Sequence, residues 1–366
     1  MMSANVHSNL TELQAYAGLI SDNETVIATD QTVEKLDYHG ISLLALERGS
    51  LNKMMCEQLG PRRAMMVANE AMKKSALCEL FTEFNAAGLN KHLLFKGTAL
   101  AYSVYPKPWL RPRSDSDCLI DIGDFPAFQA VFKKLGYEEM FAIKGKYVSY
   151  QTTFFKALSK HTFINIDLHW KISNRQVLAD TVNLEELFAS KRCAQNLVES
   201  ANIPHPVDSA IIACVHRLGH HHLEERVIWL YDIHRLAAEF THQDWDNFVQ
   251  KARLKRIAAI TLDSLVLCNR LFASQIPSGT LSQLQMAAEN YEPSQLFLQR
   301  DLAEWHYFVN DLKSLPRWRD RFGLLRETLF PAPHYMRQKM QTNSLLLAYT
   351  RRGVRGLQRI SRSNKN

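Results

Sequence analysis

The stretch LRPRSDSDCLID, residues 110–121, places two carboxylates one residue apart where a charged segment passes into an apolar one. Side chains at positions i and i+2 of a strand point to the same face, so Asp115 and Asp117 would lie side by side. Carboxylates held together away from water repel each other unless a cation lies between them. Hard oxygen ligands at this spacing suit Mg²⁺ or Mn²⁺. The stretch therefore predicts half of a metal site, with an exposed turn as the alternative.

A third carboxylate occurs in NIDLHW, at the end of a later segment rich in β-branched and aromatic residues. Asp167 stands between Ile166 and Leu168, whose side chains should point to the opposite face and into the core. A bound metal would explain an acidic residue in such a strand, so Asp167 is the candidate that completes the site. His169, two residues further on, is interpreted as a packing residue or a supporting partner rather than a ligand.

Upstream, the segment FKGTAL marks a change from a short apolar strand, HLLF, to the start of a helix. Gly97 lets backbone approach a ligand closely, and the free N–H groups at a helix N-terminus attract phosphate. Lys96 adds a positive charge beside Gly97 and Thr98, although a lysine at a strand end can also be simply solvated. A phosphate-binding segment and metal-binding carboxylates in one small region indicate phosphoryl or nucleotidyl transfer.

The hydrophobic pattern divides the chain into three regions. Residues 1–90 show helical spacing, including a long run over 62–87 that Gly88 should end. Residues 91–176 mix short apolar strands with helices and include two strands, YVSYQTTFFKAL and HTFINIDLHW, joined by a turn. Residues 177–366 are helical again and end in a basic tail. The pattern predicts an α+β fold, in which a small mixed β-sheet core is flanked by helical regions.

Charge is distributed unevenly along the chain. Its 44 Lys and Arg and 37 Asp and Glu give a net charge of +7, but residues 317–366 alone contain 12 basic and 2 acidic side chains. This basic tail could contact nucleic acid, an anionic surface or phosphates. A solvated helix end is the simpler interpretation, and nucleic acid is not the favoured partner.

The cysteines and the hydropathy of the chain indicate the cellular compartment in which the protein is expected. The six cysteines are scattered and contain no CxxC pair, which favours reduced thiols over a disulfide framework. The first residues, MMSANVHSNLTELQ, show no basic region followed by an apolar run, and no apolar stretch approaches the length of a bilayer span. We therefore expect a cytoplasmic protein without a membrane span.

The segment HRLGHHH, residues 216–222, raises the alternative of a zinc site. His216 and His220 are four residues apart and would share one helical face. No HExxH motif is present, and a third ligand would have to come from elsewhere. We interpret the two histidines as structural or as lining a cleft opposite the aspartates. Asp232, which lies between apolar neighbours of a later helix, could hydrogen-bond to one of them and line the same cleft.

The string LFKGTALAYSVYPKPWLRPRSDSDCLID, residues 94–121, resembles the signature of the uncharacterised nucleotidyltransferase family within the DNA polymerase β-like superfamily. The matching residues are Lys96-Gly97, Tyr105-Pro106, Arg111-Pro112, Asp115, Asp117 and the later strand Ile166-Asp167-Leu168-His169-Trp170. The His-x-x-x-His pair and a Trp-Leu-x-Asp segment extend the likeness over most of the chain, although only residues 94–170 have the specificity of a motif. Two departures are the long connection from Gly97 to Asp115 and the polar Ser116 where an apolar residue is usual.

The resemblance implies a polymerase β-like core and a metal-dependent transfer of an NMP group from an NTP such as ATP to a hydroxyl or similar group, with release of pyrophosphate. Asp115 and Asp117 would hold the metal that carries the triphosphate, and Asp167 would share a second metal or act as general base. Lys96 and Arg111 would neutralise phosphate charge. The nucleotide-binding residues would be Lys96, Gly97, Thr98 and Arg111.

The acceptor stays open among small molecules, peptides and saccharides. One alternative is that the same site moves a phosphoryl group to a peptide or small molecule. Another is a nucleotide- or nucleic-acid-binding protein without catalysis, against which the three aspartates argue.

Overall fold

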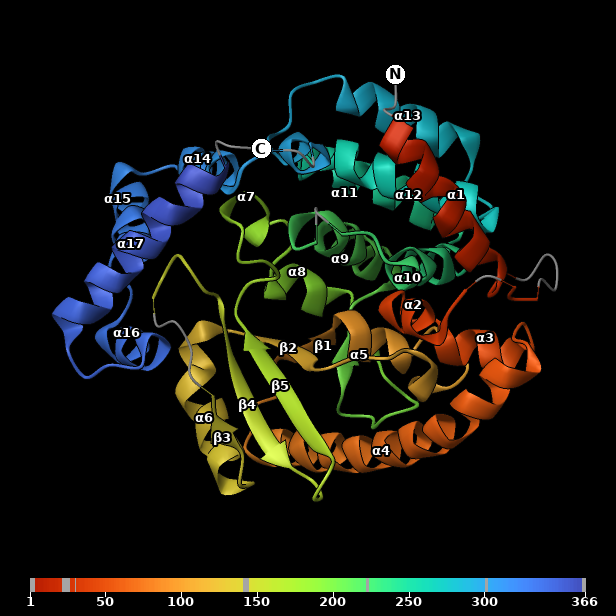
Figure 1. Cartoon of the computed structure of the whole chain (residues 1–366), viewed down its shortest axis with the longest axis horizontal. Coiled ribbons are helices and arrows are strands. Elements are labelled where there is room, and N and C mark those ends of the chain that lie inside the picture. Colours follow the sequence, from red (N-terminus) through yellow and green to blue (C-terminus); the bar gives the residue numbers. More distant parts are fainter. Residues whose placement is uncertain are drawn as a thin grey trace.

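In the computed structural model, which describes residues 4–21, 27–29, 31–140, 145–221, 224–299 and 302–363, a mixed β-sheet lies among helices (Figure 1). The predicted α+β fold, with a small mixed sheet flanked by helices, is therefore confirmed. Within these residues, no helix is both long enough and apolar enough to cross a membrane.

The main sheet has five strands in the order β1-β2-β5-β4-β3. Only β2 and β5 run parallel, and the other neighbouring pairs are antiparallel. The strands are β1 (His92–Phe95), β2 (Ser116–Ile120), β3 (Glu138–Glu139), β4 (Gln151–Ala157) and β5 (Phe163–His169). The predicted hairpin is present as β4 and β5. A separate two-stranded sheet is formed by β6 (Arg192–Cys193) and β7 (Asn202–Ile203).

Alternation along the strands gives the sheet two different faces. The first face packs against α4 (Lys53–Ala86) and α6 (Phe125–Lys134), and its apolar side chains are Leu94, Cys118, Ile120, Phe154, Ile164, Ile166 and Leu168. Ile166 and Leu168 thus point into the core as predicted. The opposite face carries Leu93, Phe95 and Leu119, which belong to a second core shared with helices from both ends of the chain. Asp117, Asp167 and His169 alternate with the first set and lie on this second face.

The long helix α4 begins earlier than the apolar pattern indicated. The Asn52 side chain accepts a hydrogen bond from the Met55 N–H at 3.0 Å, which caps the helix, and Pro61 lies within it. At the other end the helix stops at Ala86, and Gly88 adopts a positive φ of 74°, as expected of a glycine that ends a helix.

The second core joins the N-terminal helices to the later helical region. Besides α4, the helices before the sheet are α1 (Ala4–Gly18), α2 (Val33–Tyr38) and α3 (Ser42–Arg48), and α5 (Lys96–Ala101) follows β1. The later helices are α7 (Gln176–Ala179), α8 (Leu184–Ala189), α9 (Pro206–Gly219), α10 (Val227–Ala237), α11 (His242–Leu254), α12 (Ala258–Phe272) and α13 (Ser278–Ala288). Short 3-10 turns occupy Pro108–Leu110, Ile122–Asp124 and Pro293–Leu298.

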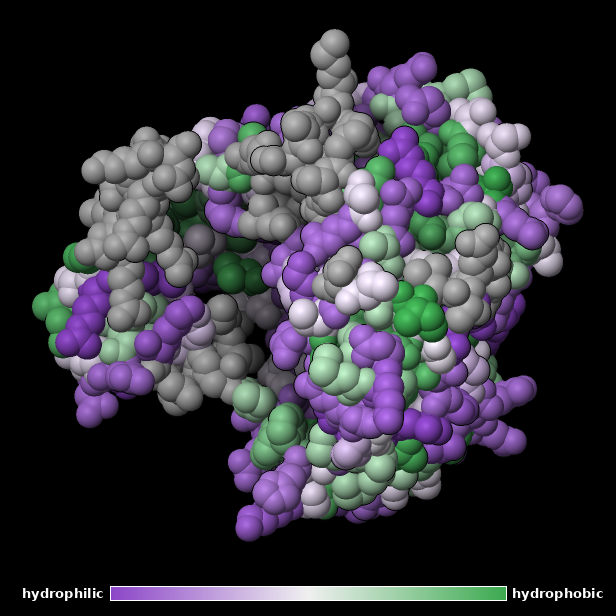
Figure 2. Space-filling view, turned by 45° about the vertical axis from the view of Figure 1, so that its right-hand side comes forward, coloured by the Kyte–Doolittle hydropathy of each residue, from purple (hydrophilic) through white to green (hydrophobic). Residues whose placement is uncertain are grey.

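The last four helices lie at the left of Figure 1, and α16 and α17 share a small core of their own. They are α14 (Glu304–Ser314), α15 (Trp318–Leu329), α16 (Pro333–Met340) and α17 (Leu345–Ser363). Figure 2 shows a surface on which hydrophilic and hydrophobic residues are interspersed, with a hollow beside the lobe at the left.

The loop before β4 docks onto α15. The Glu327 carboxylate accepts hydrogen bonds from the backbone N–H groups of residues 146, 147 and 148, at 2.9, 2.9 and 3.3 Å. The Tyr147 hydroxyl donates to Asp320 at 2.7 Å, and its ring packs against Gly323. Because these N–H groups bond to a side chain instead of a neighbouring strand, β4 begins at Gln151, later than the sequence pattern predicted.

Candidate active site

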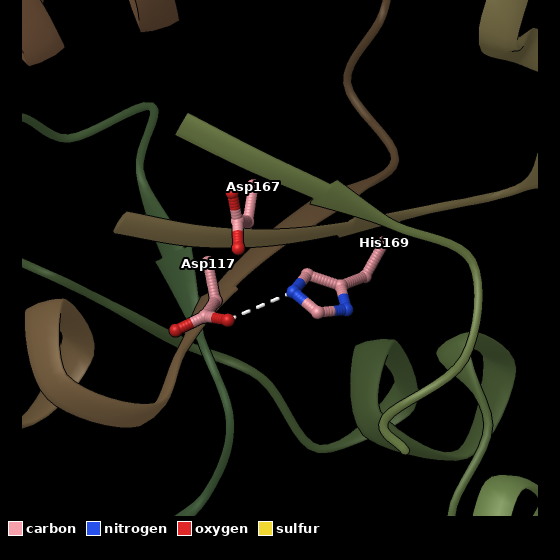
Figure 3. Close-up of side chains that lie close together, drawn as sticks. All are labelled: Asp117, Asp167 and His169. Atoms are coloured by element: carbon pink, nitrogen blue, oxygen red, sulfur yellow. Dashed lines mark hydrogen bonds and ion pairs between the residues drawn. The ribbon is translucent and has the colours of Figure 1, made fainter. Parts of the chain in front are cut away.

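Two strands bring a carboxylate pair and a histidine together. In the parallel pairing of β2 with β5, Asp117 stands opposite Asp167, and His169 is two residues further along the same face. The side chains of Asp117, Asp167 and His169 converge in Figure 3, and one potential ligand atom from each lies within 4.8 Å of the others. This close group thus contains two of the three predicted aspartates.

Asp117 is held in place by two donors on one oxygen. Lys96 Nζ donates to its Oδ1 at 2.7 Å, and His169 Nε2 lies 2.8 Å from the same atom. Burial alone would raise the pKa of Asp117, but the Lys96 ammonium and the hydrogen bond from His169 outweigh burial and hold that pKa well below its ordinary range. Asp117 is therefore ionised at neutral pH although it is nearly inaccessible to water.

Asp167 is supported by the neighbouring strand β4. Thr153 stands opposite it in the register, and the Thr153 hydroxyl donates to Oδ1 at 2.6 Å. The Gln151 amide donates to Oδ2 at 2.9 Å, and Asn174 in turn donates to the Gln151 oxygen at 3.2 Å. Burial raises the pKa of Asp167 above its ordinary value, and the charge of Asp117 adds to that effect, whereas the Thr153 hydrogen bond opposes it.

Asp115 lies one residue before β2, outside the group of three. The Ser114 hydroxyl donates to its Oδ2 at 3.2 Å. Burial raises the pKa of Asp115, and the nearby charges of Asp117 and Asp167 raise it further, so the three carboxylates share one electrostatic environment. A divalent cation among them would offset this repulsion.

Thr98 and Ser116 form a buried link beneath the loop before β2. The Thr98 hydroxyl lies 2.9 Å from Ser116 Oγ and 3.3 Å from the Asp115 carbonyl oxygen, and Arg113 Nε donates to it at 3.0 Å. Arg113 also pairs with Glu70 of α4 at 2.6 Å. The polar Ser116 side chain therefore has a buried hydrogen-bond partner. The Thr98 hydroxyl forms its other hydrogen bonds with residues of the loop before β2.

Arg111 and Asp232, which both line the cleft, form an ion pair. The guanidinium donates through Nε to Oδ1 at 2.8 Å and through Nη2 to Oδ2 at 2.7 Å, and the Tyr105 hydroxyl donates to the same Oδ1 at 2.7 Å. Asp232 thus pairs with an arginine and a tyrosine instead of a histidine. The bidentate pair fixes α10 against the stretch that leads to the aspartates.

His216 and His220 stack on each other at the end of α9, with ring centroids 5.4 Å apart. Burial lowers the pKa of His216 well below its ordinary value and lowers that of His220 to about 3, with the Lys96 charge adding to both shifts. Both rings are therefore neutral at physiological pH. In the part of the chain that the structure describes, neither belongs to a group of three potential metal ligands.

Most of the predicted residues line a cleft of about 560 Å³. One wall is formed by Lys96, Gly97, Arg111, Asp115 and Asp117, and His216 and Asp232 also line the cleft. Tyr38, Arg226, Ile228 and Trp229 line it as well. Thr98, Asp167 and His220 are not among the lining residues. The volume suits a nucleotide-sized ligand.

The donor set fits a hard divalent cation. Three carboxylates share the electrostatic environment, the pKa values of two are raised, and oxygen atoms of Asp117 and Asp167 lie within 4.8 Å of each other. Carboxylate-rich sites of this kind suit Mg²⁺ or Mn²⁺. A metal here could polarise phosphoryl oxygens and stabilise charge that develops on them.

Sequence reasoning did not single out Gln151, Thr153 or Glu70. The signal for the first two was available, because Gln151 and Thr153 occupy alternate positions of β4 and so share a face of the sheet, as Asp167 and His169 do on β5. No local pattern indicated Glu70, because the long helix α4 brings it to Arg113 from a distant part of the chain.

The sequence profile of a family described as uncharacterised nucleotidyltransferase matches residues 25–273, which include the whole main sheet and the cleft. A search of curated proteins found no match.

Proposed function

The chain belongs to the uncharacterised nucleotidyltransferase family, and from that premise we propose that it transfers an NMP group from an NTP to a hydroxyl or similar group of an acceptor. The acceptor oxygen forms a bond to the α-phosphorus, the bond to the β-phosphate breaks, and pyrophosphate leaves. The observation that carries the proposal is the meeting of Asp117 and Asp167 beside Lys96, where Lys96 and Asp117 line a cleft of about 560 Å³.

We assign the three carboxylates to the reacting end of the cleft. Asp115, Asp117 and Asp167 would hold Mg²⁺ or Mn²⁺, which supplies Lewis-acid stabilisation of the phosphoryl oxygens. Asp117 stays ionised because Lys96 and His169 hold its Oδ1. Asp167 keeps a fixed orientation through Thr153 and Gln151, so it can also accept the proton of an acceptor hydroxyl.

We assign Lys96 and Gly97 to the phosphate chain. Lys96 is next to the carboxylates, and Gly97 follows it on the cleft wall. Arg111 lies on the same wall, but its bidentate bonds to Asp232 already satisfy much of its charge. We therefore give Arg111 a positioning part, in which it shapes the wall against which the nucleotide rests.

The position of the label in the product tests the reaction. The full chain is incubated with Mg²⁺, a cell extract and each NTP in turn, labelled either on the α-phosphate or on the γ-phosphate. Nucleotidyl transfer puts the α-label, but not the γ-label, into a product. Incorporation of the γ-label would instead favour phosphoryl transfer, and binding without incorporation would favour a non-catalytic nucleotide-binding protein.

A matched set of variants tests the site. We expect Asp117→Asn and Asp167→Asn each to lower α-label incorporation by about a hundredfold or more, since each removes a carboxylate from the reacting centre. Asp124→Asn, on an exposed aspartate outside the cleft, should leave incorporation unchanged. Full activity in Asp117→Asn together with Asp167→Asn would show that the site has been placed wrongly.

A further inference from the structure

Helix α15 presents a row of large apolar side chains to solvent. Trp318, Phe322, Leu325 and Leu329 recur at positions i, i+4, i+7 and i+11, so they form one stripe along the helix. Trp318 is 72% exposed and Phe322 is 61% exposed. Phe330 directly follows the helix and is also exposed. A contiguous apolar stripe of this kind usually marks an interaction surface.

Arginines border the stripe on both sides. Arg319 and Arg326 each follow a stripe residue by one position, whereas Arg317 and Arg321 each precede one. At 100° per residue these positions lie on opposite edges of the stripe. All four residues are exposed, although Arg321 also donates through Nε to the Leu315 carbonyl oxygen at 2.8 Å. The exposed side of α15 is thus an apolar strip between two rows of positive charge.

The acidic residues of α15 are on its other side. Asp320 accepts a hydrogen bond from the Tyr147 hydroxyl, and Glu327 accepts the backbone N–H groups of residues 146–148. These bonds turn both carboxylates toward the loop before β4. The docked orientation of α15 therefore leaves apolar and basic residues outward and keeps the two acids inward.

We propose that α15 is a docking helix for an anionic lipid surface, lying in the plane of the membrane with its apolar stripe inserted among the acyl chains. An in-plane helix of this type combines a Trp, Phe and Leu face with flanking arginines, because the apolar side chains enter the acyl boundary while the guanidinium groups meet anionic headgroups. The proposal does not depend on the reaction proposed for the cleft.

The combination of charged and apolar side chains favours a lipid surface over a second copy of the chain or a nucleic acid as the binding partner of α15. Two copies of the chain that paired stripe to stripe would bring their arginine rows together, and like charges in contact are unfavourable. A nucleic acid would match the arginines but would leave the leucines and Trp318 against phosphates. An anionic membrane satisfies both features at once.

A second exposed apolar set lies on α17. Leu346 and Val354 are exposed, and the helix contains no acidic residue. The Arg352 guanidinium donates to the Thr328 carbonyl oxygen at 2.7 Å, and Tyr349 donates to the Pro331 carbonyl oxygen at 2.6 Å, so α17 is bound to the end of α15. The two helices therefore form one basic unit with apolar side chains exposed on each.

Vesicle flotation of the full chain tests the proposal. We expect the protein to float with vesicles of phosphatidylcholine mixed with phosphatidylglycerol and to stay behind with phosphatidylcholine alone. Trp318→Ser with Phe322→Ser should lower binding by about tenfold or more, because two large apolar anchors are removed. Arg317→Gln with Arg326→Gln should lower it by about fivefold per arginine. Leu254→Ser with Tyr291→Ser removes two equally exposed apolar side chains elsewhere and should change nothing.

Tryptophan fluorescence gives a second measurement, which does not depend on the stability of the double variant. Acyl chains carrying bromine should quench tryptophan fluorescence in the wild type, and Trp318→Phe should keep binding but reduce the quenching. Equal flotation of the wild type and the Trp318→Ser, Phe322→Ser variant would overturn the proposal. The proposal would also be overturned if the wild-type chain did not float and instead formed a dimer that these substitutions dissociate. The same holds if a chain that does not float bound oligonucleotides in a way that depends on these side chains.

Discussion

Lys96, which lies in the candidate active site, adopts an unusual backbone conformation. Its φ is +55°, in the left-handed region that lysine seldom occupies, just where β1 passes into α5. This turn lets the side chain reach Asp117 at 2.7 Å. Strain of this kind persists where surrounding contacts fix it, and it is often found at functional sites.

We expect Lys96→Gly to be more stable than Lys96→Ala by about 1 kcal/mol, since only glycine adopts a positive φ without strain. Both variants should lose about a hundredfold in activity, because both remove the cation beside Asp117. Chemical unfolding and the labelled-nucleotide assay measure the two effects.

Lys133 provides the control for this pair of substitutions. It is exposed near the end of helix α6, where alanine should be the more stable choice by about 1 kcal/mol. If glycine and alanine ranked in the same order at positions 96 and 133, backbone strain at Lys96 would not be the cause.

The sequence predicted the positions of some site residues but not those of others. The i, i+2 rule put Asp117 on one face of a strand, and the same rule placed Asp167. It could not show that the strand begins only at Ser116, which leaves Asp115 outside the close group. It also could not show that a distant helix supplies Asp232 to Arg111, because such pairings depend on packing between segments far apart in the chain.

Among the elements, α15 and the loop before β4 depend on each other. The Tyr147 ring lies where a side chain at position 323 would stand, so Gly323 allows the loop to pack closely on the helix. The same loop leads through Tyr150 to Gln151, which supports Asp167. Apolar periodicity predicted the strand in this region but not the bonds to Glu327 that delay its start.

Gly323→Ala should therefore lower the free energy of unfolding by about 1–3 kcal/mol, because the added methyl group would overlap the Tyr147 ring. Gly279→Ala is the matched control in helix α13, where no neighbouring atom lies within 4 Å of the added carbon. There alanine should stabilise the protein by about 0.5 kcal/mol, since it restricts the unfolded chain. Urea unfolding measures both, and equal effects at the two sites would contradict the packing argument.

Across the whole molecule, one buried carboxyl on α14 links stability to pH. Asp311 accepts the Val177 N–H at 3.3 Å and lies 3.6 Å from Arg175, in the region that follows β5. Burial raises the pKa of Asp311 from 3.8 to about 6, although the Arg175 charge opposes the shift. The folded protein thus holds this proton more tightly than the unfolded chain does.

Because the folded-state pKa is the higher one, the contribution of Asp311 to stability should fall as the pH rises from about 4 to about 6. Asp311→Asn cannot ionise and keeps an oxygen for the Val177 N–H. The difference in unfolding free energy between wild type and Asp311→Asn should therefore shift by about 2 kcal/mol against the wild type over that range. Asp246→Asn, on an exposed aspartate, should show no such trend. A difference that does not change with pH would exclude Asp311 as the titrating group.

The parallel pairing of β2 with β5 sets the time at which the site is assembled during synthesis. The β4–β5 hairpin joins neighbours in the chain and can form locally, but β2 must wait for β5 to close a long loop. A nascent chain that has not yet exposed β5 carries Asp117 without Asp167 or His169 beside it. The pair of carboxylates between the two strands is thus complete only after β5 has been synthesised and has paired with β2.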